Sequence, residues 1–163
     1  MASINLIRVD FRLIHGQVIT KWSKRVNANR MVIIDDKLAN DPFMKDIYAM
    51  AAPTGISVEA YTLQDAVNMW KENEFGNGRL LVLFKSVTSA YEALKQGLPI
   101  QELQIGGLGG GPGRINVFSA ISLDAEDVRQ LREMEKMGTE VVLHIVPEEP
   151  RVPLEKAIKK FNF

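Results

Sequence analysis

The chain has 163 residues, 46% of them hydrophobic and 25% charged, which suits one soluble globular domain spanning residues 1–163. Twenty basic residues balance twenty acidic ones, so the net charge predicts no affinity for nucleic acid and any charged site must be local. The absence of cysteine excludes disulfides, zinc–thiolate sites and thiol catalysis and fits a reducing cytoplasm, and no apolar run reaches the roughly 18 residues of a membrane span.

Short apolar segments alternate with helical patterns along the chain. The strand-like segments are Ile4–Val9, Met31–Ile34, Ile56–Tyr61, Leu80–Phe84, Leu103–Ile105 and Val141–Val146. Helix starts are predicted at Asn40-Asp41-Pro42, Thr62, Ser89 and Asp124, where a capping residue precedes an amphipathic run. This alternation predicts one α/β domain with an open, mostly parallel sheet of about six or seven strands and helices on both faces.

The loop after the first predicted strand holds the densest set of reactive side chains. Arg8, Asp10 and Arg12 precede His15, which stands at the predicted start of a helix and is followed by Gly16. A neutral imidazole is a good nucleophile toward phosphorus, and the positive N-terminal end of a helix favours that neutral form. Backbone amides and a guanidinium can hold the charge that phosphorylation adds, and Gly16 allows close approach. One loop therefore offers a nucleophile, a phosphate cradle and counter-charges.

Further candidates depend on the order of the strands. Ligands of an open parallel sheet bind beyond the carboxyl ends of the strands, where the strand order reverses. We assume that the second and third strands lie on one side of the first strand and the fourth on the other. That order places Lys85 and Ser86 beside the first loop. With Gly16, Gln17 and Arg8, they are the predicted neighbours of a bound phosphate.

Structural interpretations of these residues stay open. A histidine near a helix start is often structural, Arg8 and Asp10 can form a surface ion pair, and Asp10 can serve only as a helix cap. His144 lies in the apolar segment Glu140–Val146, so we expect a packed strand histidine there rather than a second phosphorylation site. These alternatives leave His15 as a hypothesis on the residues alone.

Other classes of protein compete with a phosphocarrier. A nucleotide-binding enzyme is suggested by Gly106–Gly113, which reads GGLGGGPG and is predicted to be a loop. No register of it matches G-x-G-x-x-G, and its role stays open. A metal-dependent α/β enzyme could use Asp10, His15, Asp35 and Asp36, but their spacing is not typical of a metal site. A regulatory binding module without chemistry is the third alternative.

A specific motif occupies residues 8–18, which read RVDFRLIHGQV and are followed by Trp22. It resembles the signature of the IIB subunits of the mannose/fructose/sorbose class of the bacterial phosphoenolpyruvate-dependent sugar phosphotransferase system. The similarity continues through Ile33–Asp36, Leu81–Lys85 and Gly106-Gly107, and it covers nearly the whole chain. Phe11 departs from the pattern, because relatives often carry an acidic or polar residue there.

The resemblance implies a phosphocarrier enzyme, a protein-phosphohistidine–sugar phosphotransferase that uses no cofactor and no metal. His15 would accept a phosphoryl group from a phosphohistidine of the IIA domain and pass it to a sugar that enters through the membrane subunits IIC and IID. Arg12 would bind the phosphate, and Asp10 would order the loop or orient the ring. The protein would be cytoplasmic, would associate peripherally with the inner face of the membrane, and could form a homo-oligomer. The identity of the sugar is not readable.

Overall fold

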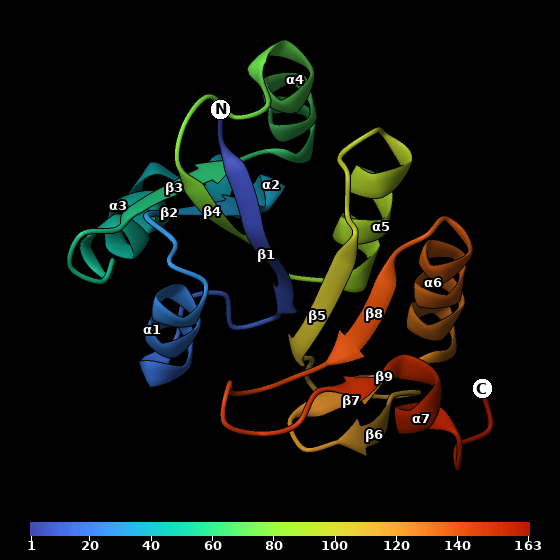
Figure 1. The fold of residues 1–163 in the computed structure, drawn as a ribbon. Coiled ribbons are helices and arrows are strands. Elements are labelled where there is room, and N and C mark those ends of the chain that lie inside the picture. The colour runs from blue at the N-terminus through green and yellow to red at the C-terminus, as the bar shows by residue number, and fades with distance from the viewer.

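The computed structural model describes all residues from 1 to 163 (Figure 1). The strands are β1 (Ser3–Asp10), β2 (Arg30–Ile34), β3 (Ser57–Tyr61), β4 (Arg79–Phe84), β5 (Glu102–Gly107), β6 (Ile115–Phe118), β7 (Ile121–Leu123), β8 (Glu140–Leu143) and β9 (Val152–Pro153). The helices are α1 (Gly16–Arg25), α2 (Asp36–Ala39), α3 (Pro42–Met50), α4 (Leu63–Asn73), α5 (Val87–Lys95), α6 (Ala125–Lys136) and α7 (Leu154–Ile158).

Seven strands form one sheet in the order β3-β2-β4-β1-β5-β8-β9. All neighbours are parallel except β8 and β9, so the predicted α/β class with a mostly parallel sheet is confirmed. The assumed strand order was wrong: β4 lies between β1 and β2, on the same side as β3, and β5 flanks β1 on the other side. Lys85 still follows a strand adjacent to β1, because Val9 is directly paired with Phe84.

Two apolar layers cover the sheet, because successive strand residues point to opposite faces. On β2, Val32 and Ile34 join the larger core cluster, to which α4, α5, α6 and α7 contribute. Met31 and Ile33 face the smaller cluster, which α1, α2 and α3 complete. Helices α1 and α3 therefore lie across the sheet from α5 and α6 (Figure 1). The prediction of helices on both faces is confirmed.

Most predicted helix starts agree with the structure. The side chains of Asp41, Thr62 and Asp124 each accept a hydrogen bond from a backbone N–H three residues later. The start predicted at Ser89 was wrong, because Ser86 caps α5 and Ser89 lies in its first turn. The capping-box pattern pointed to Ser89 because Glu92 follows it by three residues, whereas Ser86 caps the helix without an acidic residue at that spacing.

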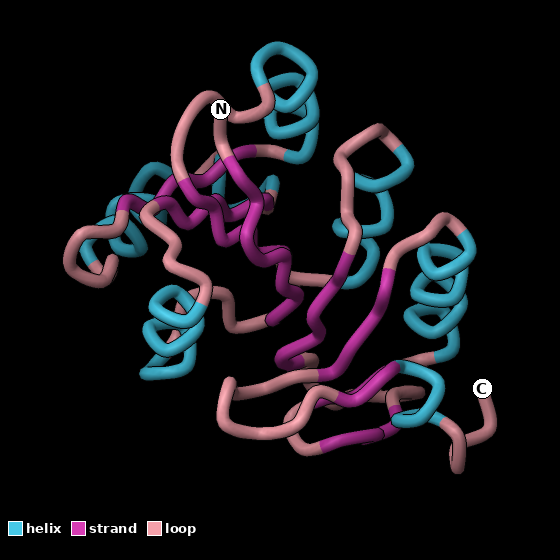
Figure 2. Tube along the Cα trace, in the orientation of Figure 1, coloured by secondary structure: helices cyan, strands magenta, loops and turns pink.

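The glycine-rich segment and the last parallel strand also differ from expectation. Gly106 and Gly107 end β5, so only the rest of the predicted loop is irregular, and it leads into the antiparallel β6–β7 hairpin. Strand β8 ends at Leu143, so His144 lies just beyond the strand. The chain between β8 and β9 then runs back toward α1 (Figure 2). The carboxyl ends of β1, β5 and β8 thus meet this segment at one edge of the sheet. No helix combines the length and the apolar character needed to cross a membrane.

Candidate functional site

The loop between β1 and α1 is held in one conformation by contacts to the sheet and the core. The N–H of Phe11 donates to the carbonyl of Gly107 at 3.1 Å, and the N–H of Leu13 donates to the carbonyl of Asp10 at 2.9 Å. Leu13 has a φ of 56°, which is unfavourable for a leucine. Its side chain is only 4% exposed in the smaller core cluster, and this burial offsets the strain. The tight turn brings the next residues of the loop back over the end of β1.

Asp10 is the centre of the site. Its carboxylate is completely buried and accepts hydrogen bonds from three side chains. Oδ1 accepts from the backbone N–H of Arg12 at 3.0 Å and from its Nε at 3.1 Å. Oδ2 lies 2.9 Å from Nε2 of His15, 3.3 Å from Nη2 of Arg12 and 3.4 Å from Nη2 of Arg8. A buried carboxylate with this many donors is a fixed anchor for the residues around it.

The balance of burial and hydrogen bonding keeps Asp10 ionised. Burial raises the pKa of its carboxyl group, but hydrogen bonds from Arg12 and His15 and the charge of Arg8 outweigh that effect, so the pKa lies below its ordinary value. Two guanidinium groups surround this single carboxylate, which leaves an excess of positive charge at the loop. Such a site suits an added anionic group.

His15 precedes the first residue of α1, as the sequence predicted, and its imidazole is 22% exposed. Because a carboxylate only accepts hydrogen bonds, the contact of Nε2 with Asp10 requires the ring proton on Nε2. A neutral ring then has its lone pair on Nδ1. No side chain caps the N-terminus of α1. The first amides of this ten-residue helix can therefore serve an anion bound at His15.

Arg12 combines an anchored side with a free side. Nε and Nη2 contact Asp10, whereas Nη1 has no hydrogen-bond partner in the protein. The side chain is 34% exposed, and its guanidinium carbon lies 5.4 Å from the centre of the Phe11 ring. Arg12 and His15 are thus fixed to the same carboxylate while each presents one free nitrogen.

Arg8 was a predicted neighbour of the phosphate, but it points into the protein. It is 1% exposed, so its pair with Asp10 is buried rather than the surface ion pair considered above. Nη1 donates to Oε1 of Gln104 and to the carbonyl of His144, and Nη2 donates to the carbonyl of Ile145. Burial lowers the pKa of Arg8 to about 10, against the opposing effect of Asp10, so the group remains charged at neutral pH.

The remaining predicted neighbours occupy the periphery. Gly16 begins α1 with a φ of 51°, and Gln17 is exposed. Lys85 is exposed, and no hydrogen bond or ion pair ties it to the loop. The hydroxyl of Ser86 accepts from the N–H of Ser89 at 3.2 Å, so its contact in the structure is that of a helix cap. The close group consists of Arg8, Asp10, Arg12 and His15.

Sequence reasoning missed the partners that β5 and the chain after β8 supply. The only signal for them was the pair Gly106-Gly107. A Cβ at Gly107 would stand 2.6 Å from Nη2 of Arg12 and 3.0 Å from Oδ1 of Asp10. Gly107 therefore makes room for Arg12, and Gly106 makes room for Arg8.

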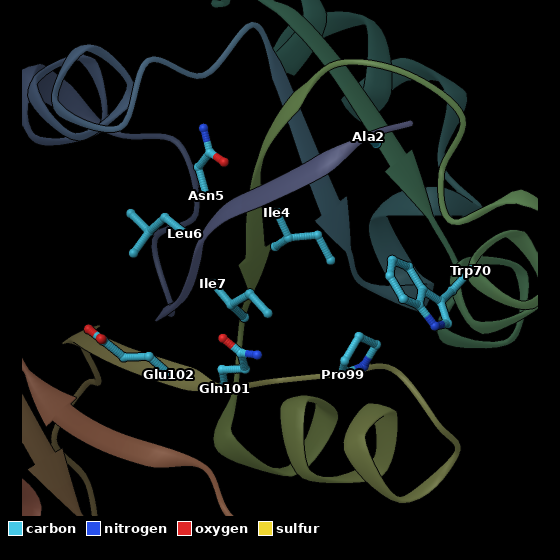
Figure 3. Close-up of a pocket in the computed structure, with 9 residues that line it drawn as sticks. All are labelled: Ala2, Ile4, Asn5, Leu6, Ile7, Trp70, Pro99, Gln101 and Glu102. Carbon is cyan, nitrogen blue, oxygen red and sulfur yellow. The ribbon is translucent and has the colours of Figure 1, made fainter.

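The competing sites receive no support from the geometry. The side chain of Asp35 caps α2 and that of Asp36 accepts from the N–H of Leu63, and no group of three or more candidate ligands is arranged for a metal ion. A pocket of 390 Å³ opens where the N-terminal part of β1 lies beside the start of β5 (Figure 3). It lies at the opposite end of the strands from His15, and Glu102 is its only ionisable side chain.

Comparison with known proteins finds relatives that match nearly the whole chain. The family model described as the PTS system sorbose subfamily IIB component matches residues 4–163. The sorbose-specific EIIB component of Klebsiella pneumoniae is 35% identical over 160 residues, which cover 98% of each chain. The crystal structure of the IIBSor domain of the sorbose permease from the same organism superimposes with a TM-score of 0.92 at 35% identity, covering 99% of each chain. The mannose-specific EIIAB component of Escherichia coli K12 is 27% identical, and the match covers 98% of this chain and 49% of that protein.

Proposed function

The chain belongs to the sorbose subfamily of IIB components of the sugar phosphotransferase system, and from that membership we propose that His15 is its phosphorylated residue. IIB components are phosphotransferases that accept a phosphoryl group from IIA and transfer it during sugar uptake. The observation that carries the proposal is the contact between Nε2 of His15 and the buried carboxylate of Asp10. It leaves Nδ1 as the free nucleophilic nitrogen.

This tautomer of His15 determines how the phosphoryl group is transferred from IIA. The lone pair on Nδ1 of His15 attacks the phosphorus of the phosphohistidine on IIA. A new P–N bond forms as the old P–N bond breaks, and the donor imidazole keeps the electron pair of the broken bond. The proton on Nε2 stays in place, so positive charge develops on the His15 ring. The carboxylate of Asp10, 2.9 Å from Nε2, stabilises that charge and holds the ring in its orientation.

Arg12 is the proposed phosphate-binding side chain. The transferred phosphoryl group spreads negative charge over its peripheral oxygens, so catalysis requires positioning and counter-charge. Nη1 of Arg12 is free to donate to these oxygens, while Nε and Nη2 keep the guanidinium on Asp10. The uncapped amides at the start of α1, including those of Gly16 and Gln17, provide further donors.

The second transfer reverses the roles. The phosphorylated ring is a cation while Nε2 carries its proton. When a sugar hydroxyl attacks the phosphorus, a P–O bond forms as the P–N bond breaks, Nδ1 keeps the electron pair of the broken bond so that neutral imidazole leaves, and the hydroxyl proton passes to solvent water. IIA and the membrane subunits IIC and IID, with the sugar, are the partners that family membership supports. We place both transfers on one exposed surface around His15. A cytoplasmic position at the inner face of the membrane, with residues 1–163 acting as one IIB domain, completes the proposal.

Labelling by phosphorylated IIA tests the proposal. The wild-type chain and His15→Ala are incubated with the donor, and the modified residue is located by mass spectrometry. We expect one phosphoryl group on wild-type His15 and none on the variant. The label should be lost in acid and stable in alkali, as expected for a phosphoramidate. A labelled His15→Ala variant, or an acid-stable label, would contradict the proposal.

A further inference from the structure

Arg8 is the largest fully buried side chain of the molecule and joins three separate segments. It belongs to β1, contacts Gln104 on β5, and donates to two carbonyl groups just beyond β8, those of His144 and Ile145. Its fourth partner is the carboxylate of Asp10. The proposed phosphoryl transfer uses no atom of Arg8, so its function in the site is unassigned.

The fold provides a specific space for this guanidinium. A Cβ on Gly106 would stand 2.0 Å from both Cζ and Nη2 of Arg8, closer than any real contact. The φ of Gly106 is not in the positive range, so the close approach of Arg8, rather than the backbone conformation, requires glycine here.

The chain after β8 is fastened to α1 at the same place. Nε1 of Trp22 donates to the carbonyl of Ile145 at 2.8 Å, and the ring of Trp22 lies edge-on to that of His144 at 4.7 Å. The guanidinium of Arg8 lies 5.6 Å from the centre of the Trp22 ring. Arg8 thus contacts the helix that follows His15, the segment packed on that helix, and the carboxylate that orients His15.

We propose that Arg8, seated in the space left by Gly106, is a positioning residue that fixes the Asp10 carboxylate and thereby sets which nitrogen of His15 is phosphorylated. This inference rests on the proposed role of His15. Oδ2 of Asp10 contacts Nη2 of Arg8 as well as Nη2 of Arg12 and Nε2 of His15, so Arg8 is one of the three side chains that fix its position. Without Arg8, the Asp10 carboxylate keeps its hydrogen bonds with Arg12. It loses the link that the Arg8 guanidinium makes to β5 and to the chain beyond β8. The imidazole can then turn and present Nε2 to the donor.

Two substitutions disturb Arg8 in different ways. Arg8→Leu removes the guanidinium, whereas Gly106→Ala keeps it but displaces it. We expect each to lower kcat for transfer from phosphorylated IIA by about 10²-fold per folded molecule, since a misplacement of roughly 1 Å can have this effect. The KM for IIA should change little, because Arg8 is buried. ³¹P and ¹⁵N NMR of the labelled protein should show a mixture of Nδ1- and Nε2-phosphohistidine in place of one isomer.

The isomer ratio separates positioning from a merely structural role, because lower stability alone would reduce the folded fraction without changing that ratio. Circular dichroism and thermal unfolding give the folded fraction of each variant. The double variant Arg8→Leu/Gly106→Ala relieves the clash, because leucine has no atom at the position of Nε, and it should be no worse than Arg8→Leu alone. Gly110→Ala is the matched control, since its Cβ would be 3.9 Å from Oγ of Ser122, an ordinary contact.

The outcomes distinguish this inference from the proposed function. If wild-type protein carries one isomer on His15 while Arg8→Leu and Gly106→Ala keep the wild-type kcat and the same single isomer, Arg8 is not a positioning residue and the inference fails. If the double variant lost kcat by the product of the two single-variant factors, the part assigned to Gly106 would likewise be overturned. If wild-type His15 takes no label, the proposed function itself has failed.

Discussion

Nε2 of His15 lies 2.9 Å from Oδ2 of Asp10, and the carboxylate of Asp10 has no exposed surface. The orientation of a partly exposed ring is therefore set from inside the fold, at the end of β1. The same carboxylate holds Arg12 through Oδ1. The proposed nucleophile and the side chain proposed to bind phosphate thus share one rigid support, which is the arrangement that rapid phosphoryl transfer requires.

The phosphoryl group of the wild-type protein should be on Nδ1 of His15. The reason is that Nε2 carries the proton donated to Asp10 and has no lone pair available for attack. NMR of the phosphorylated protein distinguishes the two isomers, and His15→Ala should take no label. His144→Gln is the control, because the other histidine should be dispensable for labelling. A uniform Nε2 isomer in the wild-type protein would show that the ring turns before it reacts.

Arg12→Lys should fold normally but transfer the phosphoryl group about 10²–10³-fold more slowly, the usual effect of losing one preorganised donor to a developing anion. A lysine cannot contact Asp10 through two nitrogens and still present a third to the phosphoryl oxygens. Rapid-quench measurement of transfer from IIA gives the rate. Arg129→Lys, at an exposed ion pair on α6, serves as the control. Equal rates for both variants would remove Arg12 from the mechanism.

Asp10→Asn should destabilise the fold by about 3–5 kcal/mol near neutral pH, because it leaves the buried charge of Arg8 without its counter-ion. The folded-state pKa of Asp10 lies below the ordinary value of 3.8, so the unfolded chain takes up its proton first as the pH falls. The stabilisation by Asp10 is thus complete when the pH is above 3.8, and it is lost as the pH falls through the folded-state pKa.

Urea unfolding of wild type and Asp10→Asn, from neutral pH to well below 3.8, measures this effect. The difference in unfolding free energy between the two proteins should shrink only at the acidic end. Asp46→Asn, which removes an exposed carboxylate on α3, should leave the unfolding free energy of the protein nearly unchanged. A difference that stays constant down to the lowest pH would argue against an ionised Asp10 as the source of the stability.

Gly107→Ala should slow transfer while the protein remains folded. The added Cβ would stand 2.6 Å from Nη2 of Arg12, and the flexible end of that side chain is the atom group that can move away. Displacing Arg12 should approach the effect of Arg12→Lys, at about 10²-fold in rate. The rate is compared with that of Gly110→Ala, whose Cβ meets no close neighbour. A wild-type rate in Gly107→Ala would mean that Arg12 works equally well in another position.

Phe11→Asp should weaken docking of IIA without disturbing the fold. The Phe11 ring is 40% exposed, and it lies beside Arg12 and near Gly109 at the edge of the site. A charge there should raise the KM for IIA more than it lowers kcat, because Phe11 touches no reacting atom. Phe43→Asp, at an aromatic residue that is 71% exposed on α3, is the matched control. If both variants keep wild-type kinetics, Phe11 is not a contact of IIA.

Much of the fold was predictable because local patterns encode it. The alternation of β-branched segments with capped helices predicted the parallel sheet, and the motif around His15 predicted both the family and the helix start. The β6–β7 hairpin was missed because its strands are only four and three residues long and follow a glycine-rich segment. The true cap of α5 was missed because Ser89, with Glu92 three residues later, fits the capping-box pattern and Ser86 does not.

The sequence by itself determined which residues form the reactive loop, since Asp10, Arg12 and His15 are close along the chain and their turn is local. Tertiary structure alone decided the part played by Arg8, whose partners Gln104 and His144 are 96 and 136 residues away in sequence. It also decided the strand order, which places β5 beside β1 and so brings Gly106 against the guanidinium. Contacts of this kind depend on how whole strands pack. A short sequence motif does not show whether its arginine faces solvent or the core.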